Sequence, residues 1–448
     1  MNHPSGERRH LHSATRHTFM AKAPANMDKR AHRMQWWRQA RFGMFIHWGL
    51  YSALGGIWNG RKVRFGPAEW IMCEKLIPKR SYRRIAADFN PVDFDADRIA
   101  RLAKAAGMKY MVFTAKHHDG FSMFHSRLTR YNIVDATPFK RDPVAELAAA
   151  CDRHELRFGL YYSQLDWNWS AAPLAFAPIV NFADYLDFLM GQLEELLTGY
   201  GPVSTLFFDG DWMPQWTAKT GARVEALCRS LQPDVIINDR VGKRYLPEGV
   251  LVAGKPLTEH FPILKKFDPG AEAGDYLTPE QYVPARGFPR DWETCMTFND
   301  SWGFKQDDHN WKDTRTLIKM LVKCASLSGN FLLNVGPNAE GIIPEESASR
   351  LREIGKWLER NGEAIFGTVG GPVNDWQARS TRKGKTIFLF LSRWPGTIAL
   401  KFDERVKRVR VVGVPGRELP FKQPGGHLTL KLDGKRPEET VSVLAVEV

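Results

Sequence analysis

The stretch Tyr110-Met-Val-Phe-Thr-Ala-Lys-His-His-Asp119 passes from a mainly apolar run directly into two histidines and an aspartate. Its first part, Tyr110–Ala115, is rich in aromatic and apolar residues, which is typical of a strand buried on both faces. The stretch Phe42–Trp48 (FGMFIHW) has the same character and carries His47 near its end. Each stretch therefore predicts a buried strand with a polar side chain at the point where a loop begins.

Further short apolar runs follow along the middle of the chain, separated by stretches of helical period. Repeated strand–helix units imply parallel strands joined by crossover helices. Since no GxGxxG follows an early strand, residues 34–370 suit a closed barrel better than an open dinucleotide-binding sheet. We therefore expect an α/β catalytic domain there, a (β/α)8-like TIM barrel. Its other strands are expected at Phe158–Ser163, Ser204–Asp209, Val235–Asn238 and Phe331–Val335, and helices at Asp95–Ala106, Pro143–Arg153, Phe182–Leu197 and Thr314–Leu327.

The two ends of the chain differ from its middle. Residues 371–448 hold short alternating runs separated by Gly, Pro and charged residues, which predicts an antiparallel β-sandwich. Residues 1–33 are polar and basic, and we expect a disordered tail there. They lack the apolar run of about 7–15 residues found in a secretory signal, so a cytoplasmic location is expected. The strands of the sandwich are expected at Thr386–Ser392, Thr397–Phe402, Val406–Val414, His427–Leu432 and Val441–Val448.

Composition argues against several classes of protein. Of the 448 residues 43% are hydrophobic and 25% charged, and no apolar run reaches the roughly 18 residues of a membrane-spanning helix. The net charge of +13 is concentrated at the ends, which leaves only +1 between residues 34 and 370. We therefore expect neither a nucleic acid nor a membrane as a partner, while a homo-oligomer stays open. The five cysteines form no CxxC pair, so no cysteine zinc site is indicated.

The polar residues at the predicted strand ends indicate a site, because the carboxyl ends of barrel strands line active sites. In the run His117-His118-Asp119, adjacent histidines on an extended strand point to opposite faces, and HExxH is absent, so we expect no metal ion. Two neutral imidazoles can instead bind hydroxyl groups, since each offers a donor and an acceptor. Several of the fifteen tryptophans follow predicted strand ends and can stack on a pyranose. These residue types favour a sugar as the substrate, without a cofactor.

Hydrolysis of a glycoside requires two carboxyl groups, one facing the anomeric carbon and one facing the leaving oxygen. Asp209 is the strongest candidate for the first, because the apolar run Leu206–Phe208 leads directly to it and Gly210 follows. Glu280 and Glu293 lie on later segments and are the candidates for the second.

From about Trp36 to Gly367 the sequence resembles the α-L-fucosidases of glycoside hydrolase family 29. The resemblance implies a retaining, exo-acting hydrolase that releases terminal α-L-fucose from an oligosaccharide or glycoconjugate. It also implies a (β/α) barrel followed by a β-sandwich. The segments that carry it, in chain order, are FGMFIHWGLYS, AEW, FTAKHHDGF, YYS followed by DW, FFDGDW, INDR, GDYLTPE, WETCMT, NDSWGF, NFLLNVGPNAEG and NGEAIFG.

The resemblance also assigns roles to residues. Asp209 corresponds to the nucleophile, which forms a covalent fucosyl-enzyme. Glu280 is favoured as the acid/base because relatives often keep this residue in a TPE-like stretch, and Glu293 is the alternative. The segment between Val241 and Ala273 is long, and its sequence does not indicate how it folds. The residues that match positions holding fucose hydroxyls or forming the pocket wall are His47, Glu69, Trp70, His117, His118, Tyr161 and Arg240, and those matching aromatic positions beside the nucleophile are Phe207 and Trp212.

Two other functions stay open from the sequence. A fucose-binding protein that has lost turnover would keep the pocket, although Asp209 and a later glutamate are both present. A metal-dependent hydrolase would use His117, His118 and Asp119, and its activity would be lost in a chelator.

Overall fold

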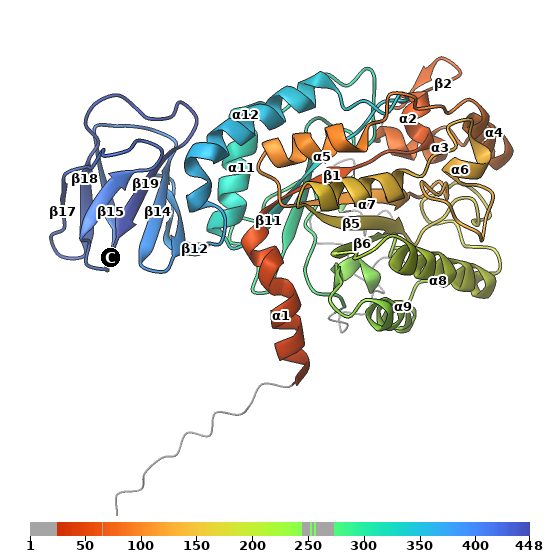
Figure 1. Ribbon diagram of the computed structural model, residues 1–448, viewed down its shortest axis with the longest axis horizontal. Coiled ribbons are helices and arrows are strands. Elements are labelled where there is room, and N and C mark those ends of the chain that lie inside the picture. The colour runs from red at the N-terminus through yellow and green to blue at the C-terminus, as the bar shows by residue number, and fades with distance from the viewer. Residues whose placement is uncertain (1–24, 65, 244–250, 253–254, 257–272) are drawn as a thin grey trace, which may run out of the picture.

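The computed structural model describes residues 25–64, 66–243, 251–252, 255–256 and 273–448. A barrel-like α/β domain is followed by a smaller all-β domain, which lies to one side of it beside α11 (Thr314–Ser326) and α12 (Glu345–Asn361) (Figure 1). Both expected domain types are thus present. Among the described residues, no helix has the length and apolar character needed to span a membrane.

The barrel contains a seven-stranded sheet in which each neighbouring pair is parallel. The edge strands at its two ends do not pair directly with each other. Instead the segment 276–280 lies between them, with bridges from Asn238 to Tyr276, from Leu277 to Trp292 and from Glu280 to Cys295. This segment takes the place of a further strand. The sheet order is β10 (Glu293–Thr297), β11 (Asn330–Val335), β1 (Phe42–Ile46), β4 (Tyr110–Lys116), β5 (Arg157–Ser163), β6 (Thr205–Asp209) and β7 (Ile236–Ile237).

The helices follow the strands as the sequence pattern predicts, and several have side-chain caps. Asp95 accepts a hydrogen bond from the backbone N–H of Arg98 at the start of α5, and Asp142 does the same for Ala145 at the start of α7. The long helices are α5 (Ala96–Ala105), α7 (Pro143–Arg153), α8 (Phe182–Gly199) and α9 (Ala218–Leu231). The short helices are α2 (Leu50–Leu54), α3 (Ile71–Glu74), α4 (Lys79–Arg84) and α6 (Ile133–Ala136). Small strands outside the main sheet are β2 (Ile57–Trp58), β3 (Arg61–Lys62), β8 (Leu251–Val252) and β9 (Lys255–Pro256).

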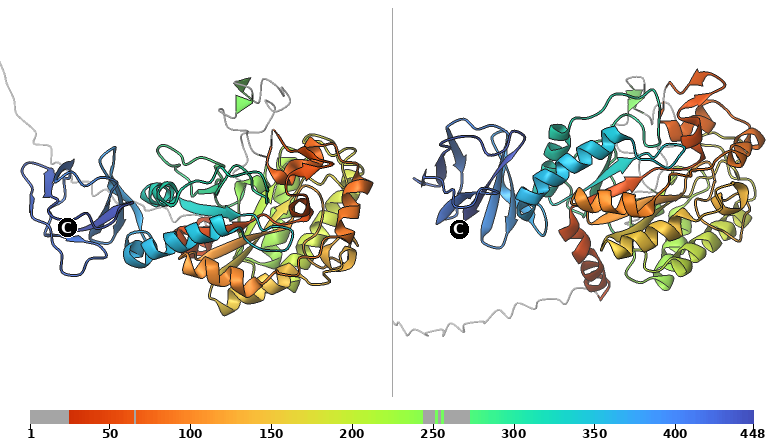
Figure 2. Two further views of the ribbon diagram at one scale, coloured as in Figure 1. Left: turned by 90° about the horizontal axis from the view of Figure 1, so that it is seen from above. Right: turned by 45° about the horizontal axis from the view of Figure 1, so that its top comes forward.

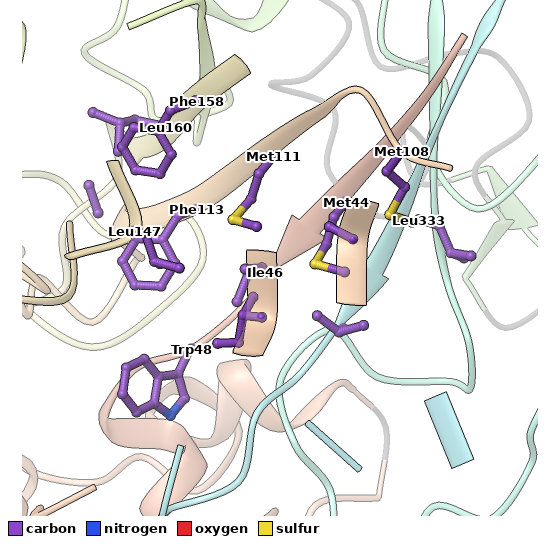
Figure 3. Packing of buried hydrophobic residues seen from close by; sticks show 14 of the residues in the cluster. Met44, Ile46, Trp48, Met108, Met111, Phe113, Leu147, Phe158, Leu160 and Leu333 are labelled. Atoms are coloured by element: carbon purple, nitrogen blue, oxygen red, sulfur yellow. The ribbon is translucent and has the colours of Figure 1, made fainter. Parts of the chain in front are cut away.

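Alternate residues of the barrel strands serve two different cores. Met44 and Phe113 belong to the large cluster between strands and helices, where Figure 3 shows Phe113 near Leu147 of α7. Phe45 and Val112, one position away, belong to a separate cluster with inward-facing residues of the other strands. Strands buried on both faces are the reason that the apolar runs of the sequence are continuous rather than alternating.

The C-terminal domain consists of two antiparallel sheets around their own apolar core. It packs on the barrel through α11 and α12, and the indole Nε1 of Trp357 donates to the carbonyl of Val441 across this contact. Figure 2 shows this arrangement from two further directions. One sheet has the order β12 (Val369–Asn374), β13 (Arg379–Lys383), β14 (Thr386–Leu391), β19 (Ser442–Glu447), β16 (Arg408–Val411), and the other β15 (Thr397–Lys401), β18 (His427–Lys431), β17 (Phe421–Lys422).

The structure differs from the sequence-based boundaries at two places. The helix α1 (Ala25–Ala40) begins inside the segment 1–33 that was expected to be a disordered tail, while the expectation for residues 1–24 lies outside the described residues. Arg33 in α1 is paired with the buried carboxylate of Asp275 at 2.6 Å, a contact distant in sequence that composition does not reveal. β12 begins at Val369, so the second domain begins slightly before residue 371.

Candidate active site

A pocket opens where the strands β1, β4, β5 and β6 end. It brings together eleven of the residues predicted from the sequence, from segments spread over more than two hundred positions of the chain. They are His47, Glu69, Trp70, His117, His118, Tyr161, Phe207, Asp209, Trp212, Arg240 and Glu280, and the pocket is completed by Phe45, Cys295 and Trp302.

Asp209 is the last residue of β6, and its carboxylate is held on both oxygens. Oδ1 accepts a hydrogen bond from Nη1 of Arg240 at 2.7 Å, and Oδ2 accepts one from the hydroxyl of Tyr161 at 2.9 Å. Gly210 follows with φ of 93°, and a Cβ there would lie 2.5 Å from the backbone nitrogen of Leu165. The glycine lets the chain turn directly after the carboxylate, which stays fixed at the strand end.

Arg240 links the two carboxyl groups of the pocket. It lies in a short 3-10 turn after β7, is 3% exposed, and donates from Nη2 to Oε2 of Glu280 at 2.8 Å while Nη1 binds Asp209. Its Nε donates to the hydroxyl of Thr278 at 3.0 Å, and its guanidinium lies 5.1 Å from the ring centre of Phe207. With its position fixed on several sides, this side chain holds Asp209 and Glu280 in one orientation.

Glu280 lies at the pocket rim. It is at the end of the segment 276–280 that closes the barrel, bridges to Cys295, and has a side chain 42% exposed. A carboxyl group at the rim can meet both the leaving group of a bound glycoside and water. Of the two candidates for the second carboxyl group, Glu280 is the one that faces Asp209 across the pocket.

Glu293 lies elsewhere. It is the first residue of β10 and pairs with Asn330, the first residue of β11, so it belongs to the amino-terminal end of the barrel. It accepts a hydrogen bond from the hydroxyl of Tyr110, the first residue of β4, and burial raises the pKa of its carboxyl to about 8. Since parallel strands place their first residues at the opposite end from the pocket, the sequence alternative Glu293 is separated from Asp209 by the barrel interior.

His117 and His118 both line the pocket, although neighbouring residues of a regular strand point to opposite faces. The strand β4 ends at Lys116, and its register against β5 shifts between Thr114 and Lys116. Beyond that point the two rings come within 4.2 Å of each other, centre to centre. The end of the strand therefore lets both imidazoles reach the same cavity.

The histidines are neutral at ordinary pH. Burial lowers the pKa of His47 to about 3, and burial lowers that of His118 to about 4 although the carboxylate of Asp209 opposes the shift. Burial also lowers the pKa of His117, well below its ordinary value. Each neutral ring thus carries one proton, so one of its two nitrogens is a donor and the other an acceptor.

Asp119 does not join the histidines in the pocket. Its carboxylate accepts hydrogen bonds from the hydroxyl of Tyr82 at 3.0 Å and from the backbone N–H of Phe121 at 3.1 Å. Within the part of the chain that the structure describes, no group of three His, Cys, Asp or Glu side chains is arranged to hold a metal ion. His117 and His118 therefore line the pocket, whereas Asp119 is not among the residues that line it.

Glu69 and Trp70 come from a short 3-10 turn, Ala68–Trp70. Glu69 is fully buried, accepts the backbone N–H of Gly303 on Oε2 at 2.8 Å, and has no partner on Oε1 among the described residues. Burial raises the pKa of its carboxyl to about 8. Trp70 stacks on Trp212 with ring centres 6.1 Å apart, which forms an aromatic wall next to His118.

Three pocket residues were not among the candidates. Phe45 precedes His47 by two positions, so strand alternation places both side chains on the inner face, and this period is a usable signal. Trp302 lies 5.0 Å from His47, ring centre to ring centre, and belongs to a segment that already carried the family resemblance. Cys295 also belongs to a segment that carried the resemblance, WETCMT, but its bridge to Glu280 depends on the segment that closes the barrel.

The comparisons with known proteins agree on one family. The family model described as Alpha-L-fucosidase matches residues 10–363. Plasma α-L-fucosidase of Homo sapiens is 32% identical over 389 residues, covering 80% of this chain and 76% of that protein. Tissue α-L-fucosidase of Mus musculus is 30% identical, with 85% of this chain and 83% of that protein covered.

Solved structures give the same result. α-L-Fucosidase isoenzyme 1 of Paenibacillus thiaminolyticus superposes with a TM-score of 0.80 and 34% identity, covering 94% of this chain and 99% of that one. A family 29 α-L-fucosidase of Bacteroides thetaiotaomicron, solved as a trapped covalent intermediate, has a TM-score of 0.80 and 28% identity, covering 93% and 96%. The resemblance seen in the sequence is thereby confirmed: the chain belongs to the α-L-fucosidase family of glycoside hydrolases.

Proposed function

We propose that this protein is an exo-acting, retaining α-L-fucosidase in which Asp209 is the nucleophile and Glu280 the acid/base. The observation that carries the assignment is the guanidinium of Arg240, which binds both carboxyl groups at the mouth of one pocket. A single side chain can bridge only carboxyl groups that lie near each other. Retention is supported by the related fucosidase of Bacteroides thetaiotaomicron, which was solved as a trapped covalent intermediate.

In the first step Asp209 attacks the anomeric carbon while Glu280 gives its proton to the glycosidic oxygen. The C–O bond to the leaving group breaks, an alcohol departs, and a fucosyl ester of Asp209 remains. The hydrogen bonds from Tyr161 and Arg240 orient the attacking carboxylate before the reaction. The guanidinium of Arg240 also places a positive charge 2.7 Å from Oδ1 of Asp209, and nucleophilic attack requires this group as its carboxylate.

In the second step Glu280 accepts a proton from water while the water oxygen attacks the anomeric carbon, the ester bond to Asp209 breaks, and the carboxylate of Asp209 is released. Fucose leaves with the configuration it had in the substrate, because the carbon has been inverted twice. The partly exposed side chain of Glu280 suits this exchange of one proton with alcohol and then with water, whereas Asp209 lies deeper, with its side chain 12% exposed.

The remaining residues of the pocket recognise the sugar. His47, His117 and His118 supply hydrogen-bonding nitrogens, and Trp70 and Trp212 present flat apolar surfaces. Fucose is a 6-deoxy sugar whose methyl group gains by burial against such walls, at about 0.8 kcal/mol per carbon. A galactose 6-hydroxyl would lose hydration at the same place, so fucosides attached to oligosaccharides or glycoconjugates are the proposed substrates.

The test is hydrolysis of 4-nitrophenyl α-L-fucoside beside 4-nitrophenyl β-D-galactoside, each with and without EDTA. Proton NMR in the first minutes identifies the anomer that is released. We expect release from the fucoside only, unaffected by EDTA, with α-L-fucose appearing before mutarotation. Initial β-fucose would contradict retention, loss of activity in EDTA would favour the metal-dependent alternative, and binding without release would favour the sugar-binding alternative.

A further inference from the structure

Two of the pocket histidines are hydrogen-bonded to side chains that can act only as acceptors in these bonds. Nδ1 of His118 lies 2.6 Å from the hydroxyl oxygen of Ser163, and Nδ1 of His47 lies 2.7 Å from Oδ1 of Asn334. All four side chains are buried, with at most 4% exposed. In each pair the direction of the hydrogen bond follows from what the neighbour does with its other atoms.

Ser163 has a single hydroxyl hydrogen, and that hydrogen is already used. The hydroxyl donates to the backbone carbonyl of Leu165 at 2.6 Å, and a carbonyl oxygen can only accept. Ser163 therefore accepts from His118, which must carry its proton on Nδ1. The other ring nitrogen of His118, Nε2, is left with a lone pair.

Asn334 is fixed in the same manner. Its Nδ2 donates to the backbone carbonyl of Trp302 at 2.7 Å, so rotating the amide by half a turn would bring two oxygens together. Oδ1 therefore faces His47 and accepts from it. His47 carries its proton on Nδ1 as well, and its Nε2 also has a lone pair.

The orientation of these nitrogens matters because both rings line the pocket. Nε2 of His118 lies 3.7 Å from Oδ2 of Asp209, so two acceptors face one another beside the nucleophile. No hydrogen bond to Nε2 of either ring is present among the described residues. A hydroxyl group of the sugar can supply the hydrogen that each of these acceptors lacks.

His117 provides a contrast within the same pocket. Its Nδ1 is buried and has no hydrogen-bond partner in the described part of the chain. Nothing there decides which of its nitrogens carries the proton. Fixed tautomers are thus a property of His47 and His118 rather than of every histidine in the site.

We infer that Ser163 and Asn334 are positioning residues that hold His118 and His47 as Nδ1–H tautomers, so that each histidine presents the sugar with an acceptor and no donor. The inference rests on the proposed role of the histidines in binding fucose. The pocket then favours sugars whose hydroxyl groups donate hydrogen bonds to these two nitrogens. A fucose in which the hydroxyl facing either nitrogen is replaced by fluorine, which accepts weakly and cannot donate, should be bound poorly.

The first experiment reads the tautomers directly in the wild-type protein. Nitrogen NMR of protein labelled with ¹⁵N-histidine distinguishes a protonated Nδ1 from a protonated Nε2, and His118→Asn and His47→Asn each remove one set of signals for assignment. We expect both residues to be Nδ1–H between pH 6 and 8. A protonated Nε2 at either position would overturn the inference, and the measurement needs no activity, so it stays readable if the proposed function fails.

The second experiment measures how the pocket discriminates among sugars. Dissociation constants are determined for L-fucose and its 2-, 3- and 4-deoxyfluoro analogues. In the wild type, fluorination at the positions facing His118 and His47 should weaken binding about tenfold to a hundredfold, as expected for a buried acceptor left unpaired. In Ser163→Ala, which frees His118 to move its proton to Nε2, the penalty at one position should shrink by about tenfold.

Two variants separate positioning from general loss of structure. Ser163→Thr keeps the hydroxyl and should restore the wild-type discrimination. Ser122→Ala removes another buried hydroxyl, which accepts from Gln192 at 2.9 Å and touches no histidine, and should leave the ratios of the dissociation constants unchanged. If Ser163→Ala weakens fucose and all its fluorinated analogues equally, the residue is only structural and the inference is wrong.

Discussion

Asp209 and Glu280 are bound to the two terminal nitrogens of one guanidinium group, at 2.7 Å and 2.8 Å from Arg240. Asp209 comes from the end of a strand and Glu280 from the segment that closes the barrel. Their mutual position therefore depends on a residue that performs no covalent step. Arg240 holds the carboxylates of Asp209 and Glu280 in one orientation at the mouth of the pocket.

Arg240→Lys should reduce kcat/KM by about a hundredfold or more. A single ammonium group cannot bind both carboxyl groups with fixed geometry, and the developing charge is less well stabilised. Arg38→Lys, at a partly exposed pair with Asp291, serves as the control and should leave kcat/KM unchanged. A wild-type kcat/KM for Arg240→Lys would contradict the bridging role.

Asp209→Gly should fold and lose nearly all hydrolysis, by about a thousandfold or more, because no carboxylate remains to attack the anomeric carbon. Sodium azide should restore turnover of an activated aryl fucoside and give the β-fucosyl azide, since a small anion fits the vacated space. Product analysis by NMR checks this, with azide added to the wild type as the control. An α-fucosyl azide, or turnover equal to that of the wild type, would exclude Asp209 as the nucleophile.

The loss of hydrolysis rate in Glu280→Ala should depend on the leaving group of the substrate. A fucosyl disaccharide needs a proton on the departing oxygen and should lose rate by about a hundredfold or more, whereas a dinitrophenyl fucoside departs without one. The basic limb of the pH–rate profile should flatten. Glu293→Ala, at the other end of the barrel, should change both substrates equally. If the leaving-group dependence occurs in Glu293→Ala instead, the acid/base assignment must move to that residue.

Glu293→Gln should alter how stability depends on pH. The pKa of Glu293 is raised from 4.5 to about 8 by burial, so folding favours its protonated form. This contribution is complete below the unfolded value near 4.5 and is lost as pH rises through about 8. The glutamine side chain stays neutral at every pH. The Tm of Glu293→Gln should therefore fall several degrees less than the Tm of the wild type between pH 5 and 9. Calorimetry at constant ionic strength compares the two slopes, and parallel slopes would show that Glu293 ionises freely.

Asp166→Ala should be strongly destabilising. Asp166 pairs with Lys116 at 2.8 Å, and their side chains are 1% and 0% exposed, so the substitution leaves an ammonium group buried without its partner. The expected loss in the free energy of unfolding is about 3–5 kcal/mol. Glu155→Ala removes the exposed partner of Lys104 and should change the free energy of unfolding far less, because water screens an exposed ion pair. Urea titration of both variants measures the difference, and equal losses would contradict the role given to burial.

Some features could be predicted because they are local. The strands that end at Ile46, Lys116 and Asp209 are mainly apolar runs with polar residues at or after their ends, and their inner and outer neighbours alternate with period two. Of the helices with side-chain caps, α5, α7 and α11 are predicted by the same kind of short-range pattern, whereas α6 and α9 are not among the expected helices. β12, β13 and β17 were not expected, since they are rich in Gly, Pro or charge and become strands only by pairing with neighbours.

The sequence by itself determined the family, most strands of the barrel, several of its helices, and the set of residue types that line the pocket. Only the tertiary structure showed that Glu280 lines the pocket with Asp209 while Glu293 lies at the other end of the barrel, because this depends on which end of a parallel strand each carboxyl group occupies. It also decided that His117 and His118 share one pocket, through the register shift at the end of β4, and that α1 is tied to Asp275. Proximity of residues distant in sequence is set by strand pairing and packing, and those contacts have no local pattern from which they can be predicted.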